Sequence, residues 1–212
     1  MQTFSSKELY MMNGGNKLYI HKDGFGDIYN STAAEEQEWA REIVANALAK
    51  IDTEANAVVL KFAIESLRFH NYTGLEALLI QKAKEASPVR QVVFATALWN
   101  QCKYHDSFEI VYQNLCENRA ACLDIVFISL DEFKANDAAK KFLLSCLEGD
   151  DDTLFIKAHT TISLWAYTGM PLLRENNLLD LLKIENRNEP GFKSAVENLK
   201  QIFWAGIASH IK

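Results

Sequence analysis

Apolar side chains recur at intervals of three and four residues along most of the chain, from about residue 33 to the C-terminus. This spacing places them on one face of an α-helix, so the pattern predicts a series of amphipathic helices. In the first of these, Trp39, Ile43 and Ala47 share a face. Ser31 or Thr32 is expected to cap its start. Further helices are predicted over residues 54–70, 74–86, 88–101, 106–117, 119–131, 135–148, 152–168, 171–184 and 190–209.

The residues between the predicted helices are few and include typical capping and helix-breaking types. Ser87-Pro88 puts proline at the first position of a helix, and Asp152 or Thr153 is expected to cap another. Short connections force consecutive helices to lie antiparallel. The chain is therefore predicted to be all-α and built from helical hairpins.

Corresponding side chains recur in the second helix of successive hairpins. One apolar position, called the anchor position here, repeats after 31, 32, 34 and 38 residues, at Leu67, Leu98, Leu130, Leu164 and Ile202. A small residue precedes the first four anchors, namely Ser66, Ala97, Ser129 and Ser163. A mostly large, apolar residue stands five places before them, at Phe62, Val93, Ile125 and His159. A period of this length predicts hairpins that stack on one another in the same way.

The segment SPVRQVVFATALW, residues 87–99, resembles the second helix of a HEAT repeat, with a Ser-Pro turn, Val-Arg and then small and apolar residues ending in Ala-Leu. The segment DDTLFIKAHTTISLW, residues 151–165, is a weaker copy. The resemblance implies a right-handed α-α superhelix, a HEAT-like solenoid of about five antiparallel helix pairs, over residues 33–212. It also implies a scaffold that binds proteins or peptides along a concave surface of second helices. A compact helical bundle without superhelical stacking is the alternative architecture.

Residues 1–32 differ from the rest and are predicted to form a separate N-terminal extension. They hold four of the nine glycines, and LYIHKDGFGDIY suggests two short strands about an Asp23-Gly24 turn. Glycine readily adopts the positive φ that such a tight turn requires. A short hairpin or an irregular segment is therefore expected there.

Charge and composition argue against several classes of function. The chain carries 22 basic and 28 acidic side chains, a formal net charge of −6, and has no basic stripe, so we expect no nucleic-acid partner. Apolar runs stay short of the roughly 18–20 residues that span a bilayer, and the start lacks a secretory signal, which indicates a cytoplasmic protein without a membrane partner. The four cysteines include no CxxC pair and are interpreted as reduced core residues, and we expect no metal and no cofactor.

A column of aromatic and charged side chains directly follows the anchor positions, at Arg68, Trp99, Asp131, Trp165 and Phe203, and the first four are candidate binding residues. If this column faces the groove, it forms a partner-binding stripe, since Trp and Arg are enriched at interface hot spots. The alternative is that the two tryptophans fill the junction between layers of helices.

The acidic run Asp150, Asp151 and Asp152 extends the predicted binding surface. Between Asp124 and Asp152 the chain holds eight acidic residues and three lysines, a local net charge of −5. This concentration predicts an anionic patch that favours a basic partner. The simpler interpretation is a solvated loop that also caps the next helix.

His159 stands in a column that is otherwise apolar. It is interpreted either as a hydrogen-bonded structural residue or as an acid-base group paired with a carboxylate. The sequence has no GxSxG, no HExxH and no phosphate- or dinucleotide-binding glycine motif. No specific catalytic chemistry is therefore predicted.

We expect a non-catalytic adaptor, or an immunity or inhibitor protein, that binds a protein partner through the solenoid groove. The alternative is a groove enzyme similar to the repeat-built DNA glycosylases or chromophore lyases of HEAT-like families, acting on a nucleobase or small ligand. The acidic surface argues against DNA as its substrate. The sequence carries no signal for the oligomeric state or for the identity of the partner. The candidate groups of the enzyme are Trp99, Trp165, Asp131, His159 and Arg90.

Overall fold

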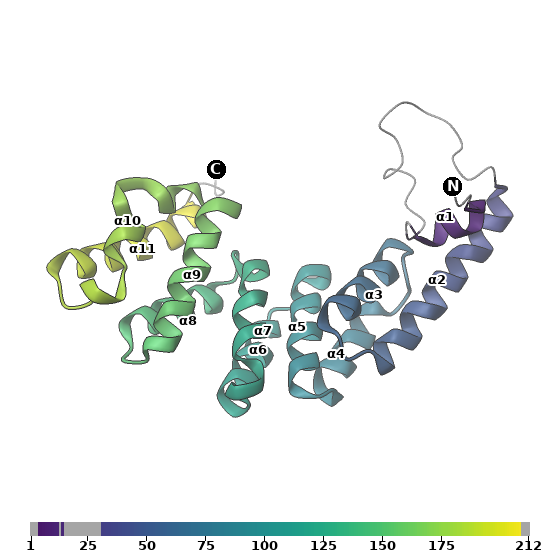
Figure 1. Ribbon diagram of the computed structural model, residues 1–212, viewed down its shortest axis with the longest axis horizontal. Helices are drawn as coiled ribbons and strands as arrows, with labels where there is room; N and C mark the ends of the chain where they lie inside the picture. Colours follow the sequence, from purple (N-terminus) through teal and green to yellow (C-terminus); the bar gives the residue numbers. More distant parts are fainter. Residues whose placement is uncertain (1–3, 13, 15–30, 209–212) are drawn as a thin grey trace. The chain divides into compact units, whose positions relative to one another are not determined.

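The computed structural model describes residues 4–12, 14 and 31–208, with side chains except at 175–176 and 205–208. Every regular element within these residues is a helix (Figure 1). The predicted all-α class is thus confirmed for the described part of the chain. The hairpin predicted about Asp23-Gly24 lies outside the described residues.

Short connections join the helices, as the sequence predicted. Across the described residues, none of the helices combines the length and the apolar character needed to cross a bilayer. The elements are α1 (Ser6–Met12), α2 (Ala33–Thr53), α3 (Ala57–Phe69), α4 (Leu75–Glu85), α5 (Pro88–Cys102), α6 (Ser107–Glu117), α7 (Arg119–Ser129), η2 (Leu130–Phe133), α8 (Asp137–Glu148), α9 (Asp152–Thr168), η3 (Pro171–Asn177), α10 (Leu178–Leu181), η4 (Ile184–Asn186) and α11 (Pro190–Ala208), where η marks a 3₁₀ helix.

Capping chemistry explains where several helices begin. Thr32 accepts a hydrogen bond from the backbone N–H of Glu35, and the Glu35 carboxylate accepts one from the backbone N–H of Thr32. This reciprocal capping box satisfies two amide groups that lack partners at the start of α2. At α9 the predicted cap is wrong: the cap is Asp151, whose backbone is extended and whose side chain accepts from the N–H of Leu154 at 3.0 Å.

The predicted continuous helix over residues 171–184 is also wrong. The chain instead forms the 3₁₀ helix η3, the single short turn α10 and the 3₁₀ helix η4. Asn177, between η3 and α10, has a φ of 55° in the left-handed region. A residue in that conformation interrupts an α-helix, and the apolar spacing of the sequence does not report it.

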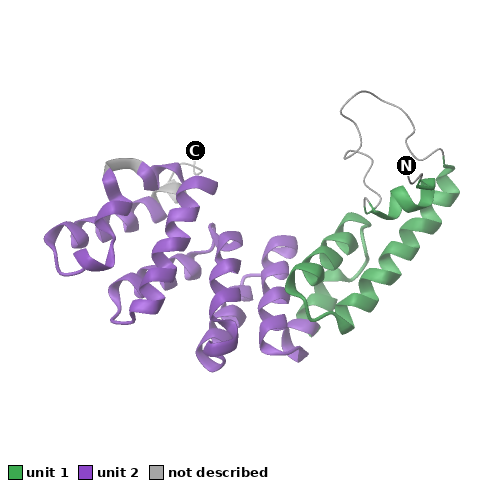
Figure 2. Ribbon diagram, viewed as in Figure 1, with its two compact units in different colours: residues 1–81 green, residues 82–212 purple. Residues whose placement is uncertain are grey.

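The chain divides into two compact units, residues 1–81 and residues 82–212 (Figure 2). In the first unit α2 packs on α3, and α1 packs on α2 through Tyr10 and Trp39, whose ring centroids lie 5.3 Å apart. His70 Nε2 lies 3.1 Å from the carbonyl oxygen of Gly14. Helix α1 was not predicted, because a helix of seven residues holds too few repeats of an apolar pattern to be recognised.

In the second unit, helices pack on the helix two places further along the chain as well as on their sequence neighbours. Helix α5 packs on α7, α7 on α9, and α6 on α8. Two hydrogen bonds join residues that are 33 positions apart in the sequence. Trp99 Nε1 donates to the backbone oxygen of Glu132, and Lys157 Nζ donates to Oδ1 of Asp124. A separation of 33 residues lies within the range of spacings between successive anchor positions. The repetition therefore corresponds to contacts between successive hairpins in this unit.

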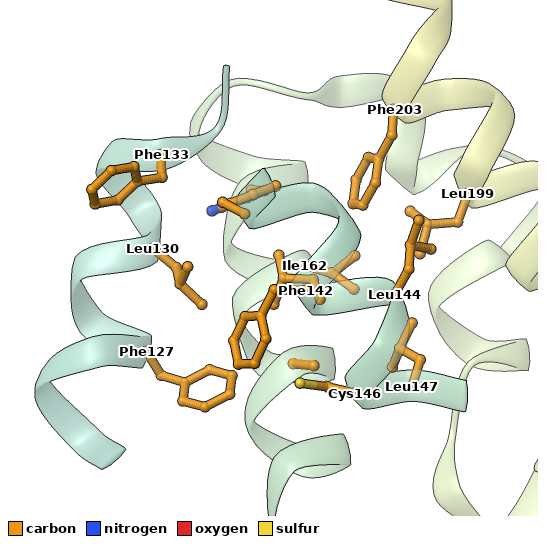
Figure 3. Close-up of a cluster of buried hydrophobic side chains, with 14 of the residues drawn as sticks. Phe127, Leu130, Phe133, Phe142, Leu144, Cys146, Leu147, Ile162, Leu199 and Phe203 are labelled. Carbon is orange, nitrogen blue, oxygen red and sulfur yellow. The ribbon is translucent and has the colours of Figure 1, made fainter. Parts of the chain in front are cut away.

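The core of the second unit extends from α5 and α6 through α7, α8 and α9 to α11, and Figure 3 shows part of it. Phe127 and Phe142 point toward one another with centroids 5.8 Å apart, and the ring of Trp165 lies 5.8 Å from that of Phe203. Removal of these side chains from water is the dominant favourable contribution to folding of the unit. Fully buried members include Leu130, Phe133, Leu147, Ile162 and Leu199.

The anchor positions keep their register in three repeats and lose it in the fourth. Leu67, Leu98 and Leu130 are fully buried, whereas Leu164 is 47% exposed. In this repeat the next residue, Trp165, is fully buried in place of the predicted anchor. Leu130 belongs to η2, where a turn takes three residues rather than 3.6.

The two residue columns before the anchors are only partly uniform. Ala97 and Ser129 are buried, whereas Ser66 and Ser163 are half-buried. In the column of large residues, Phe62 is 62% exposed although its counterpart on α5 is buried. Neither column therefore keeps one environment throughout: the small residues are buried or half-buried, and the large ones range from buried to exposed.

Candidate functional site

The two tryptophans of the predicted stripe are core residues. Trp99 is 8% exposed, its ring stacks on Phe133 at 5.7 Å, and its Nε1 donates to the backbone oxygen of Glu132 at 2.9 Å. Trp165 is fully buried against Phe203. The prediction that both contact a partner is therefore corrected in favour of its alternative. They fill junctions between helices, because buried rings have no free surface to present.

The other two members of the stripe differ from each other. Arg68 is exposed on α3 in the first unit. Asp131 in η2 is half-buried, forms an ion pair with Lys134, and accepts a hydrogen bond from Thr168 Oγ1 at 3.1 Å. Asp131 thereby ties η2 to α9. The four positions do not form one exposed column.

The three aspartates of the acidic run have different surroundings. Asp150 is exposed. Asp151 caps α9, and its Oδ2 lies 2.6 Å from Nη1 of Arg119. Asp152 Oδ1 lies 3.0 Å from Nη1 of Arg187. Two of the three carboxylates are therefore held by arginines of the same unit.

Most acidic side chains between residues 124 and 152 are paired in the same way. Six of the eight form ion pairs, and four of the six bases lie outside this segment, which is why a count along the sequence did not include them. Exposed pairs add little stability, but each reduces the attraction for a basic partner. The bases are Arg119, Lys134, Lys140, Lys157, Arg187 and Lys200.

The hydrogen bond from Arg119, followed by that from the backbone N–H of Leu154, lowers the pKa of Asp151 from 3.8 to about 2. A lowered pKa in the folded state means that the carboxylate stabilises the fold above about pH 4, and that this stabilisation is lost as the pH falls toward about 2. We expect Asp151→Asn to be less stable than the native chain near pH 7, with the difference vanishing toward pH 2. Urea denaturation across this range measures it. Asp150→Asn removes the same charge without an ion pair and is the control.

His159 is a structural residue of the second unit. It is half-buried on α9, and its Nε2 lies 3.1 Å from the carbonyl oxygen of Leu179, so that the ring N–H donates to it. This bond joins α9 to α10. The arrangement corresponds to the first of the two interpretations of the sequence.

Two cavities of the described residues can be compared with the groups considered for a groove enzyme. A cavity of about 360 Å³ lies between α1, α2 and α3, and another of about 340 Å³ lies between α6 and α8. Neither is lined by any of the five candidate groups. Within the described part of the chain, no three His, Cys, Asp or Glu side chains are grouped as a metal site requires.

The surface of α7, α9 and η3 carries large apolar side chains, of which the sequence pattern had singled out Leu164 alone, as a buried anchor. Tyr167 is 72% exposed and Ile128 is 70% exposed, values more usual for charged residues. Apolar side chains that gather on one exposed face mark an interaction surface more reliably than scattered ones do. We call the exposed large apolar side chains of these three elements the α7–α9 face: they are Ile128, Ile156, Leu164, Tyr167 and Leu172.

Two polar links fix the helices beneath the α7–α9 face. Lys157 Nζ lies 2.6 Å from Oδ1 of Asp124, and Thr168 donates to Asp131. The helices are therefore parallel: Asp124 in the middle of α7 meets Lys157 near the start of α9, and Asp131 in η2, directly after α7, meets Thr168 at the end of α9. Ile128 lies one turn after Asp124 and one turn before Asp131, so it is level with the middle of α9.

A signal for this face was present in the sequence. Ile156, Leu164 and Tyr167 are separated by eight and three residues, which places them on one side of a helix. The buried side of α9 is also apolar, with Phe155, Ile162 and others. A helix that is apolar on two sides either packs against other helices on both sides or packs on one side and binds a partner on the other. The sequence pattern does not distinguish these two cases.

Comparison of the chain with protein-family models, with curated proteins and with solved structures found no match in any of the three.

Proposed function

We propose that this protein is a non-catalytic protein-interaction module that binds its partner through the α7–α9 face. The observation that carries the proposal is the exposure of five large apolar side chains on neighbouring helices of one unit, at 47% to 72% of their surface. Exposing such side chains to water is unfavourable, and a partner that covers them removes that cost. Adaptor and immunity or inhibitor proteins are the classes that we favour, acting in the cytoplasm.

The partner that fits this face is an amphipathic helix of another protein. The exposed apolar side chains of α9 form a straight strip of roughly 16 Å, since eleven residues separate Ile156 from Tyr167 and each adds about 1.5 Å. A strip of this kind suits the apolar stripe of a second helix. Of the charges beside it, Asp124 pairs with Lys157 and Asp131 pairs with Lys134, while the Arg174 guanidinium lies 5.4 Å from the ring centre of Tyr167. We therefore expect apolar contact rather than charge to provide the affinity, in contrast to the basic partner that the sequence favoured.

The test is a photo-crosslinking amino acid at position 167 in the full chain, expressed in its native host. We expect a crosslink to the apolar side of a helix in one partner. Leu164→Asp with Tyr167→Asp should weaken binding of that partner at least about tenfold, since burial of a charge opposes association. Phe62→Asp, at an equally exposed apolar position in the first unit, is the matched control.

Several outcomes would contradict this proposal. One is binding that falls steeply with salt and is lost in Asp150→Lys, because that result identifies a basic partner on the acidic run. Another is a crosslink to a second copy of the same chain, which would identify self-association instead. A third is equal loss of binding in Phe62→Asp and in the double variant.

We also propose that the stacking of hairpins forms a right-handed HEAT-like superhelix. The packing of α5 on α7, α7 on α9 and α6 on α8 supports this proposal. A compact globule of this length would have a radius of gyration of roughly 17 Å. We expect small-angle X-ray scattering to give a clearly larger value, and a value near 17 Å would favour the compact bundle.

A further inference from the structure

The cavity between α6 and α8 has a buried apolar floor and a polar rim. It measures about 340 Å³, at the small end of the range for ligand pockets. All of its lining residues belong to the second unit, and none belongs to the α7–α9 face. The floor includes Leu115, Phe142 and Cys146, and the rim includes Tyr112, Cys116 and Arg119.

The floor is uncharged at neutral pH. Leu115, Phe142 and Cys146 are each exposed by 8% or less. Burial, with the neighbouring Asp151 carboxylate, raises the pKa of the Cys146 thiol to about 12, so this thiol stays protonated. The Tyr112 and Phe142 rings meet edge to face with centroids 5.6 Å apart. An uncharged floor with aromatic walls suits an aromatic ligand body.

The rim carries one positive charge in a fixed place. Arg119 is bound to Oδ2 of Asp151 through Nη1, while Oδ1 of the same aspartate accepts the backbone N–H of Leu154. The start of α9 therefore holds the aspartate, and the aspartate holds the guanidinium at the rim. A guanidinium has five N–H donors in a planar fork, so it can bind a second carboxylate beside the first.

We propose that this α6–α8 pocket binds a compact aromatic carboxylate, with its ring on the Phe142 floor and its carboxylate on Arg119. A monoanion fits better than a phosphate dianion, because Arg119 is the only cationic residue that lines the pocket and Asp151 lies beside it. An organic cation is disfavoured by Arg119 itself. The proposal does not depend on protein binding at the α7–α9 face.

The experiment titrates the full-length protein with 2-naphthoate and with the neutral analogue 2-naphthalenemethanol, and follows amide shifts by NMR. We expect 2-naphthoate to bind in about the millimolar range or tighter, as is usual for so small a ligand. The alcohol should bind about tenfold more weakly, since it lacks the charge-assisted hydrogen bond. Equal affinity of the two compounds, or no binding of 2-naphthoate, would overturn the proposal.

Two variants at exposed positions locate the site. Cys116→Phe should fill the mouth of the pocket and weaken 2-naphthoate binding at least about tenfold. Glu117→Phe, at the next position and outside the lining of the pocket, should leave it unchanged. Equal effects of the two variants would place the ligand elsewhere and overturn the assignment.

A third measurement uses the unaltered protein and does not depend on the stability of any variant. Cys116 is exposed at the rim, whereas Cys122 and Cys146 are buried. Bound 2-naphthoate should slow alkylation of Cys116 by N-ethylmaleimide in proportion to occupancy, with mass spectrometry identifying the labelled residue. Unchanged labelling at saturating ligand would contradict binding in this pocket.

Discussion

Trp165→Ala is expected to lower the free energy of unfolding by about 3–5 kcal/mol, the cost of removing a large buried aromatic side chain and leaving a cavity. Trp165 is fully buried and packs on Phe203, so the substitution separates α9 from α11. Leu164→Ala, one residue earlier, should cost less than about 1 kcal/mol, because 47% of Leu164 is already exposed. Chemical denaturation of both variants measures the difference.

This pair of variants also tests the register of the fourth repeat. The sequence pattern made Leu164 the buried anchor and left Trp165 either in the groove or at a junction between layers of helices, whereas in the structure Trp165 is buried and Leu164 is 47% exposed. A larger loss of stability in Leu164→Ala than in Trp165→Ala would restore the register of the sequence. It would also remove Leu164 from the α7–α9 face.

Lys140→Ala is expected to cost about 2 kcal/mol, in the range for a hydrogen bond that involves a charged group. The Lys140 side chain is 8% exposed, and its Nζ donates to the carbonyl oxygen of Phe203 at 3.1 Å. It also pairs with Asp137 at 3.3 Å and lies 5.3 Å from the ring centre of Trp204. The substitution removes the side-chain donor that joins a carbonyl of α11 to α8, so α11 should separate more readily from α8.

Hydrogen exchange of the α11 amides, together with chemical denaturation, measures the effect of Lys140→Ala. We expect faster exchange in α11 and little change in α6. Lys141→Ala is the matched control, because Lys141 is the adjacent lysine and is exposed. Equal effects of the two substitutions would show that the contact with Phe203 contributes nothing specific.

The sequence was sufficient wherever a feature depends on residues close together in the chain. The start of α2 follows from Thr32 and Glu35, three residues apart, which form the capping box that stops fraying. Pro88 opens α5 as predicted. The apolar period gives the extent of most helices, because one face must be buried whatever lies against it.

Features that depend on residues far apart in the sequence could not be predicted from the sequence pattern. The segment from residue 124 to 152 was interpreted as an anionic patch because Arg187 and Lys200 lie far along the chain from their partners Asp152 and Glu148. The pocket between α6 and α8 combines residues that are about thirty positions apart in the sequence. No local pattern distinguishes such side chains from ordinary surface residues.

The sequence by itself determined that the described chain is helical, where most of its helices lie, and the repeat period of about 33 residues at which hairpins meet. The tertiary structure alone decided which side of each helix is covered. In the structure Trp99 and Trp165 are buried in the core, Leu164 and Tyr167 are exposed, and most aspartates between residues 124 and 152 form ion pairs. The physical reason is that helix formation depends on spacing within one segment, whereas burial and ion pairing depend on what a neighbouring helix brings to the same place.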